Sequence, residues 1–448
     1  MTEERTRPPR PAVEPMPPVA EDCALPWDAP CEDPVRSLAG ARRALGDTFV
    51  VDSGDDRYVF TFSPVGVASF YLLAEESASK GVADWRMLRR KLPDELFGGR
   101  RTLPHQLFGR DDVTRFLAEV DGALAATVDE LGDRGATDVF GLTRRLGHRV
   151  GLASWGGPGA TTGARFEALV GAFDALDGAE AFVHPDAMAA VAASGKADEV
   201  RALAVVADQV GRSVAELPGE EASHPLFARV VAAWADVPDR EAAAGVAGDV
   251  ALLHVASMSN LSAALGWAFV DLLDHPVEAA RVADGDRATA EACALESIRL
   301  AQRSIMSRYV LAPVTLDVGD AVHEVAPGAT IATLLPLTNL SAAPGLADWD
   351  PGRWRGRRLA DPAALAAVEL VTAFGHGRHT CPAQPFSLAA MTRSLGTLLR
   401  TFTWEAGWTD RPVPVPAQIG GVARAAGPCP VTYRRTGSGA EGGVRPGQ

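Results

Sequence analysis

Apolar positions recur at helical spacing along most of the chain, which predicts a mainly α fold. The pattern predicts helices over residues 111–132, 138–157, 283–305 and 385–402, and further alanine-rich helical stretches from 165 to about 248. Strand patterns are few. Residues 48–51 and 58–63 flank a polar turn and predict a hairpin, and 308–319 and 323–336 are typical of strands with Pro-Gly turns. We therefore expect many helices with small β-sheets near both ends of the chain.

One segment is apolar for long enough to suggest a membrane span. Residues 251–270, ALLHVASMSNLSAALGWAFV, carry no Asp, Glu, Lys or Arg. However, His254, Asn260 and several serines make its middle polar, its flanks are acidic, and no second span follows. A helix buried on all sides at the centre of a large α protein fits this pattern better than a membrane span.

The two ends of the chain differ in composition from the rest. The first 22 residues are rich in proline and charge and lack the apolar segment of a secretory signal, which predicts a disordered arm over residues 1–25. Residues 436–448 predict a disordered tail. Because no linker or repeat interrupts the chain between them, we expect a single domain over residues 26–435.

Charge and cysteine content narrow the function classes. The chain has 43 basic and 57 acidic residues and a net charge of −14, which argues against nucleic acid or an anionic membrane as a partner. Five scattered cysteines do not form a disulfide framework and indicate reduced thiols in a cytoplasmic protein, although Cys23 and Cys31 remain a possible pair.

The candidate chemistry lies in residues 373–386, AFGHGRHTCPAQPF. His376, His379 and Cys381 fall within six positions, in a glycine-rich segment that precedes the predicted last helix. Zinc would need a fourth ligand or water, and no second CxxC or HxxxH lies nearby. A cysteine nucleophile would need a base, and His379 lies two residues away. A haem thiolate would gain from backbone N–H groups and from the helix N-terminus. All three interpretations stay open at this loop alone.

The stretch FGHGRHTC resembles the cysteine-ligand loop of the cytochrome P450 family, F-G-x-G-x-H-x-C. The resemblance implies the cytochrome P450 fold, a triangular prism that holds haem b, iron protoporphyrin IX, between the central and last helices. It implies Cys381 as the axial iron ligand, Phe374 packed beside the sulfur, Gly375 and Gly377 in the loop, and His379 at a haem propionate. Ala383 departs from the family, which usually has glycine there.

Further motifs of the family occur in the expected order, over residues 45 to 435. ESIR resembles E-x-x-R and implies a structural triad of Glu296, Arg299 and Arg353. Arg308 matches a propionate-binding arginine. Another propionate-binding position matches Arg101, with Arg100 and His105 as competitors.

The central helix departs from the family. Oxygen-activating members usually carry an acid-alcohol pair after the alanine that matches Ala256, and here Ser259 and Asn260 take those places. Serine is not a general acid near neutral pH, whereas Asn260 can donate a hydrogen bond. Asparagine at this position resembles prostacyclin-synthase-like enzymes and sterol hydroxylases. The sequence therefore favours a monooxygenase with an atypical proton relay. The alternative is chemistry independent of O2 and reductant on a substrate with an O–O or N–O bond (isomerase, dehydratase or nitrene-transfer cyclisation), and a non-catalytic haem binder or sensor is a minor alternative.

The resemblance also implies a substrate pocket and partners. The pocket residues expected beside Ala256, Ser259 and Asn260 are Val255, Met258, Ile305 and Met306. Because most are apolar, we expect a hydrophobic or aromatic small molecule, with a role in secondary metabolism. A soluble bacterial-type member would receive electrons from a ferredoxin and its reductase. We expect a cytoplasmic monomer.

Overall fold

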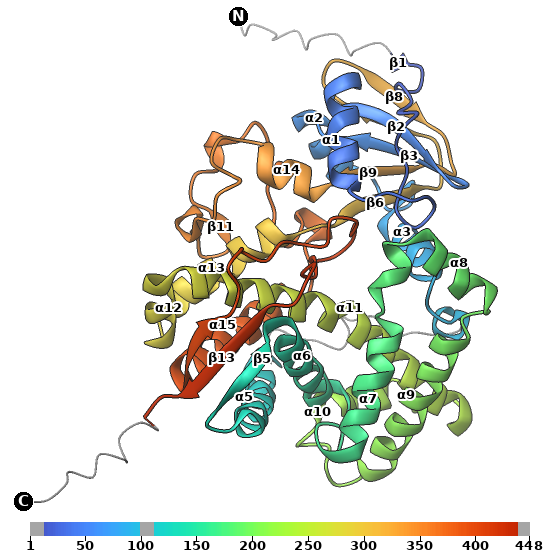
Figure 1. Cartoon of the computed structure of the whole chain (residues 1–448). Helices are drawn as coiled ribbons and strands as arrows, with labels where there is room; N and C mark the ends of the chain where they lie inside the picture. The colour runs from blue at the N-terminus through green and yellow to red at the C-terminus, as the bar shows by residue number, and fades with distance from the viewer. Residues whose placement is uncertain (1–12, 99–111, 438–448) are drawn as a thin grey trace, which may run out of the picture.

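The computed structural model describes residues 13–98 and 112–437 (Figure 1). Within these ranges the chain is mainly helical, as predicted. The helices of the first half are α1 (Pro34–Leu45), α2 (Pro64–Leu72), α3 (Lys80–Leu88), α5 (Asp112–Leu131), α6 (Val139–Trp155), α7 (Gly163–Leu176), α8 (Pro185–Ala193), α9 (Ala197–Glu216) and α10 (Pro225–Ala232). Those of the second half are α11 (Asp239–Asp274), α12 (Pro276–Ala283), α13 (Arg287–Ala301), α14 (Leu335–Ser341) and α15 (Gln384–Thr401).

The strands form four small sheets. The largest has the order β2 (Thr48–Ser53), β3 (Asp56–Thr61), β9 (Thr330–Leu334), β6 (Ile305–Val310) and β4 (Ala78–Ser79). A second joins β1 (Val13–Glu14), β8 (Val322–Val325) and β7 (Val314–Asp317), and a third joins β12 (Phe402–Ala406), β13 (Pro430–Arg435) and β5 (Arg134–Asp138). The fourth pairs β10 (Trp354–Arg355) with β11 (Arg358–Leu359). The predicted hairpin is confirmed as β2 and β3, in which Thr48 pairs with Thr61.

Helix α11 crosses the middle of the molecule, with the five-stranded sheet to one side and helices α7, α9 and α10 to the other (Figure 1). It packs against α6, α9, α13 and α15, and most of its second half is buried. Among the described residues it is the one helix whose length and hydropathy would allow a membrane span. It is central, as predicted, but it is not buried on all sides, because Ala256 and Asn260 are exposed.

Two boundaries differ from the sequence prediction. The predicted helix 283–305 begins four residues later than expected, at Arg287. Gly285 has a φ of +95°, which a helix does not allow. The Asp286 carboxylate then accepts the Thr289 N–H at 3.0 Å and caps the N-terminus of α13. That helix ends at Ala301, and Ile305 already belongs to β6.

The disordered arm predicted over residues 1–25 needs correction from residue 13 onward. Strand β1 pairs with β8. The Ala20 N–H donates to the Val50 carbonyl at 2.8 Å, and Leu25 is fully buried. The partners of this segment in β8 and β2 lie far from it in sequence, so its local composition could not predict that it is ordered.

Candidate functional site

The cysteine loop is built by backbone hydrogen bonds and one demanding glycine. The Thr372 hydroxyl accepts the N–H groups of Phe374 at 3.2 Å and Gly375 at 2.7 Å. The Cys381 N–H donates to the Phe374 carbonyl at 2.7 Å, which closes the loop. Gly375 has a φ of +81°, and a Cβ there would lie 2.5 Å from the His379 carbonyl oxygen. Only glycine therefore fits this turn without shifting the backbone.

The Cys381 sulfur lies partly buried just before α15. Burial raises the pKa of the Cys381 thiol, whereas the backbone N–H groups of Ala383 and Gln384 donate hydrogen bonds to the sulfur and lower it. Because α15 begins at Gln384, the positive end of its dipole also favours an anion at this position. The effect of burial is the larger one, so the pKa of the Cys381 thiol lies above its ordinary value in the protein without a ligand.

The structure weighs against the zinc alternative. No group of three or more His, Cys, Asp or Glu side chains within residues 13–98 and 112–437 could hold a metal ion. Nε2 of His376 is not free to bind zinc, because it is hydrogen-bonded to the Val371 carbonyl at 3.1 Å. For the nucleophile alternative, no hydrogen bond joins the sulfur of Cys381 to the ring of His379 in the described part of the chain.

Two buried polar atoms beside this loop lack a partner. They are Nε2 of His379 and the hydroxyl of Tyr71 on α2, neither of which makes a hydrogen bond within the described ranges. Their ring centroids lie 6.5 Å apart. Burial lowers the pKa of His379, and the nearby Arg308 guanidinium lowers it further. Buried polar atoms without partners are costly, so this pair indicates a place for a ligand that accepts hydrogen bonds.

Sequence reasoning missed Tyr71. Its segment, ASFYLL, looks like ordinary apolar helix packing, and the only available signal was a phenol hydroxyl in a mostly apolar run. Its position beside His379 arises from the packing of α2 on the cysteine loop, which no local pattern encodes.

Arg308 lies on β6, fully buried beside the same loop. Its Nε donates to the Ala78 carbonyl and its Nη1 to the Phe70 carbonyl, both at 2.9 Å, and Nη2 lies 3.3 Å from the Glu75 carboxylate. The guanidinium therefore ties β6 to the segment around α2. The remaining propionate candidate, Arg101, lies outside the described residues, as do Arg100 and His105.

The other expected residues of β6 point to opposite faces of the sheet. Met306 shares the face of Arg308 and packs in the cluster that contains Phe70 and Tyr71. Ile305 lies on the other face, where it lines a pocket of about 350 Å³ together with Ser307, Tyr58 and residues of α3. Strand alternation thus separates these two candidates.

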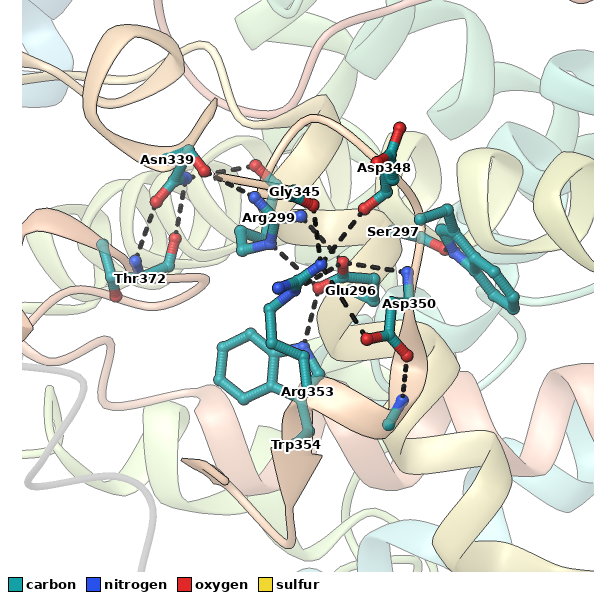
Figure 2. A network of polar contacts seen from close by, with 12 residues as sticks. Glu296, Ser297, Arg299, Asn339, Gly345, Asp348, Asp350, Arg353, Trp354 and Thr372 are labelled. Carbon is teal, nitrogen blue, oxygen red and sulfur yellow. Dashed lines mark hydrogen bonds and ion pairs between the residues drawn. The ribbon is translucent and has the colours of Figure 1, made fainter. Parts of the chain in front are cut away.

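Glu296, Arg299 and Arg353 come together in one buried network (Figure 2). The fully buried Glu296 carboxylate accepts from Arg299 Nε at 2.9 Å and Nη2 at 2.7 Å, and from Arg353 Nε at 3.2 Å. The Trp354 indole donates to it at 2.9 Å and the Asp350 N–H at 3.1 Å. This network fastens the segment around residue 350 to α13.

The same network reaches the cysteine loop (Figure 2). Arg299 Nη1 donates to the Asn339 carbonyl at 2.6 Å, and Asn339 Nδ2 donates to the carbonyls of Arg299 at 3.1 Å and Thr372 at 2.9 Å. The Thr372 N–H returns a bond to Asn339 Oδ1 at 2.8 Å. Since Thr372 also shapes the turn at Gly375, helix α13 helps to position the loop that carries Cys381.

On the central helix, two of the expected residues share an exposed face. Ala256 and Asn260 are exposed although most of the residues after them on α11 are buried, while Val255 and Ser259 are partly exposed. Met258 is 2% exposed and points toward Gly151 of α6 instead. The prediction that Met258 lines the pocket needs correction, because two residues along a helix turn a side chain to the opposite side.

The sequence matches no protein-family profile and no curated protein. Among solved structures, the chain is similar to CYP175A1 from Thermus thermophillus, a cytochrome P450. The identity is 21%, the match covers 90% of this chain and 95% of that one, and the TM-score is 0.64. This likeness confirms the predicted cytochrome P450 fold. The chemistry has to be argued from the residues of this chain.

Proposed function

We propose that this protein is a haem-thiolate enzyme of the cytochrome P450 kind, with Cys381 as the axial ligand of haem b. The observation that carries the proposal is the cysteine loop itself. It places a partly buried sulfur directly before the N-terminus of α15, in a turn closed by the hydrogen bond from the Cys381 N–H to the Phe374 carbonyl at 2.7 Å. Beside it lie two buried polar atoms with no partner in the described part of the chain.

The residues around the loop fit the propionate side of a haem. His379 Nε2 and the Tyr71 hydroxyl would donate to a propionate, and the charge of Arg308 beside them would favour that anion. Phe374 would pack beside the sulfur, and the turn at Gly375 lets the backbone of the loop approach the His379 carbonyl closely. When bound, haem would supply an iron centre able to activate dioxygen or an O–O or N–O bond of a substrate.

The exposed face of α11 would meet the substrate. Ala256 and Val255 offer apolar contacts and Asn260 a hydrogen bond, which suits a hydrophobic or aromatic small molecule with few polar groups. We place this reaction in secondary metabolism, in a cytoplasmic monomer.

The two candidate reactions differ in whether protons must be delivered to the site during the reaction. The nearest acids on α11, Asp249 and Asp271, lie ten or more residues from Ser259 and are bonded to Trp234 and Arg411. Ser259 can hold a water molecule but cannot act as an acid. A monooxygenase fed by a ferredoxin and its reductase would therefore relay protons through water. The same observation favours the second candidate, in which the oxidising O–O or N–O bond arrives within the substrate and no external proton relay is needed.

The haem-thiolate proposal is tested by the spectrum of the reduced protein with carbon monoxide. We expect the band of a thiolate-ligated haem in the unaltered protein and in a Cys31→Ser control. Cys381→Ser should lack that band. A Cys381→Ser protein that keeps the thiolate band would refute the ligand assignment.

The reaction type is tested by comparing two incubations with a metabolite extract from cells that lack the protein. One is anaerobic without reductant, and the other is aerobic with a ferredoxin, its reductase and NADPH. Mass spectrometry shows which compound is consumed. Turnover only in the aerobic incubation indicates a monooxygenase, whereas anaerobic turnover indicates an oxidant carried by the substrate.

A further inference from the structure

Asn260 presents the two ends of its amide to different surroundings. Its Oδ1 accepts the backbone N–H of Val422 at 2.8 Å. Because a backbone N–H can only donate, this contact fixes which end of the amide is the oxygen. Nδ2 makes no hydrogen bond in the described part of the chain, and the residue is exposed on the face of α11 that it shares with Ala256.

The turn that carries Val422 is itself held in place. Gln418 Nε2 donates to the carbonyls of Gly420 at 3.0 Å and Val422 at 3.2 Å. Arg303, just after α13, exchanges backbone bonds with the turn, since its N–H donates to Gly421 and its carbonyl accepts from Gly420, both at 2.8 Å. A turn bonded from two directions is a rigid support for the amide oxygen of Asn260.

A second bond joins this segment to the central helix. The Trp267 indole, two turns beyond Asn260 on α11, donates to the Ala423 carbonyl at 2.6 Å. The turn therefore cannot drift along α11 without breaking this bond as well.

Gly421 allows the close approach. Its φ is +62°, and a Cβ at this position would lie well inside van der Waals contact with Oδ1 of Asn260. Gly420 has a φ of +115°, but a Cβ there would meet no atom within 4 Å. Both glycines thus have a positive φ, but only at Gly421 would a Cβ meet the side chain of Asn260.

We infer that the turn at residues 420–422 anchors Asn260 so that its Nδ2 is a fixed hydrogen-bond donor to a lone pair on the molecule bound beside α11. This inference rests on the proposed function and narrows its substrate class. An amide N–H binds an oxygen or nitrogen lone pair but does not release its proton near neutral pH. The favoured substrate therefore presents an oxygen or nitrogen lone pair at this position. Gly421 and Val422 act as positioning residues.

Four variants separate anchoring from donation. Asn260→Asp keeps an oxygen for the Val422 N–H but loses the donor, and Asn260→Ala loses both. Gly421→Ala keeps the donor but pushes it out of place. Gly420→Ala is the matched control, because it brings backbone strain without touching Asn260.

Two measurements test the anchor and the donor in these variants. The first is the infrared C–O stretching band of carbon monoxide bound to the reduced protein, since a donor near the ligand oxygen lowers its frequency. We expect a higher frequency in both Asn260 variants, a shifted or split band in Gly421→Ala, and the original band in Gly420→Ala. An original band in Asn260→Asp or in Gly421→Ala would overturn the inference.

The second measurement is deuterium exchange of the Val422 amide, which needs no haem. We expect exchange roughly tenfold faster in Asn260→Ala and Gly421→Ala, and unchanged in Asn260→Asp and Gly420→Ala. Unchanged exchange in Asn260→Ala would mean that the anchor does not exist. A protein that lacks the thiolate spectrum altogether would refute the proposed function, while the exchange result would still decide the anchor.

Discussion

Replacing Glu296 by glutamine is the sharpest test of what holds this fold together. The carboxylate is fully buried and accepts hydrogen bonds from two arginines, one indole and one backbone N–H. Glutamine has nearly the same shape but offers an NH2 group in place of one oxygen. At least two of these donors would then face another donor, and the buried Arg299 charge would lose its counter-ion.

The expected loss of stability follows from this burial. Removing one partner of a buried ion pair costs about 3–5 kcal/mol. The matched control is Glu291→Gln on the same helix, because the Glu291–Arg357 pair, at 3.2 Å, is exposed to solvent on both sides. An exposed pair contributes about 0–1 kcal/mol. Urea unfolding followed by circular dichroism would measure both losses.

The pH dependence gives a second check of the same variant. Burial raises the pKa of Glu296, but hydrogen bonds and charge from Arg299, with further bonds from Trp354 and Asp350, bring it below its ordinary value. The unfolded chain then binds more protons than the folded one as the solution is acidified. The stabilisation by Glu296 is complete above a pH of about 4.3 and disappears as the pH falls through the lowered pKa. The difference between the unaltered protein and Glu296→Gln should shrink in that acidic range. A loss no larger than in Glu291→Gln, or a difference that grows in acid, would refute the reasoning.

Three further predictions concern the loop and the core. Gly375→Ala should weaken the thiolate spectrum strongly, because its Cβ would meet the His379 carbonyl. A Cβ at Gly377 would meet no described atom within 4 Å, so Gly377→Ala should cost only about 1–2 kcal/mol for its left-handed backbone. Equal spectra in the two variants would contradict this. Tyr71→Phe should leave the haem-free protein as stable as before, since the hydroxyl has no partner among the described residues, yet it should speed haem transfer to apomyoglobin. An unchanged transfer rate would mean that the hydroxyl does not face a propionate. Burial holds the pKa of His254 well below its usual value, so the unfolded chain binds the extra proton and stability should fall by up to about 1.4 kcal/mol per pH unit as the pH drops below about 6.5. His254→Gln should remove that part of the slope in urea titrations at several pH values, and an identical slope would exclude His254 as its source.

Features set by local chemistry were predictable from the sequence. The last helix was expected at residues 385–402 and lies at Gln384–Thr401, and the hairpin was found because its two strands adjoin in sequence. Glu296 and Arg299 lie three residues apart, so helical geometry alone brings them together. The spacing of the glycines and the single cysteine in residues 373–386 likewise identified the candidate loop from sequence.

Features set by distant partners were not predictable. Val13 pairs with Val322, and Tyr71 reaches His379 across more than 300 residues. Helical geometry places Met258 opposite Ala256 and Asn260, but that the opposite side packs against Gly151 of α6 is set by tertiary contacts. Periodicity shows that a residue is apolar, but not which of two buried faces it occupies.

The end of α13 links the two sides of the proposed haem site. Through Arg299 and Asn339 it reaches Thr372, which shapes the loop of Cys381. Through the backbone of Arg303 it holds the turn that anchors Asn260. Because Arg299 lies in the last turn of α13 and Arg303 only four residues later, just after the helix, a disturbance at Glu296 should reach both loops. Glu296→Gln should therefore speed exchange of the Val422 amide as well as weaken the thiolate spectrum, whereas Glu291→Gln should do neither. If only one of the two changes, the loops are positioned independently and α13 does not couple them.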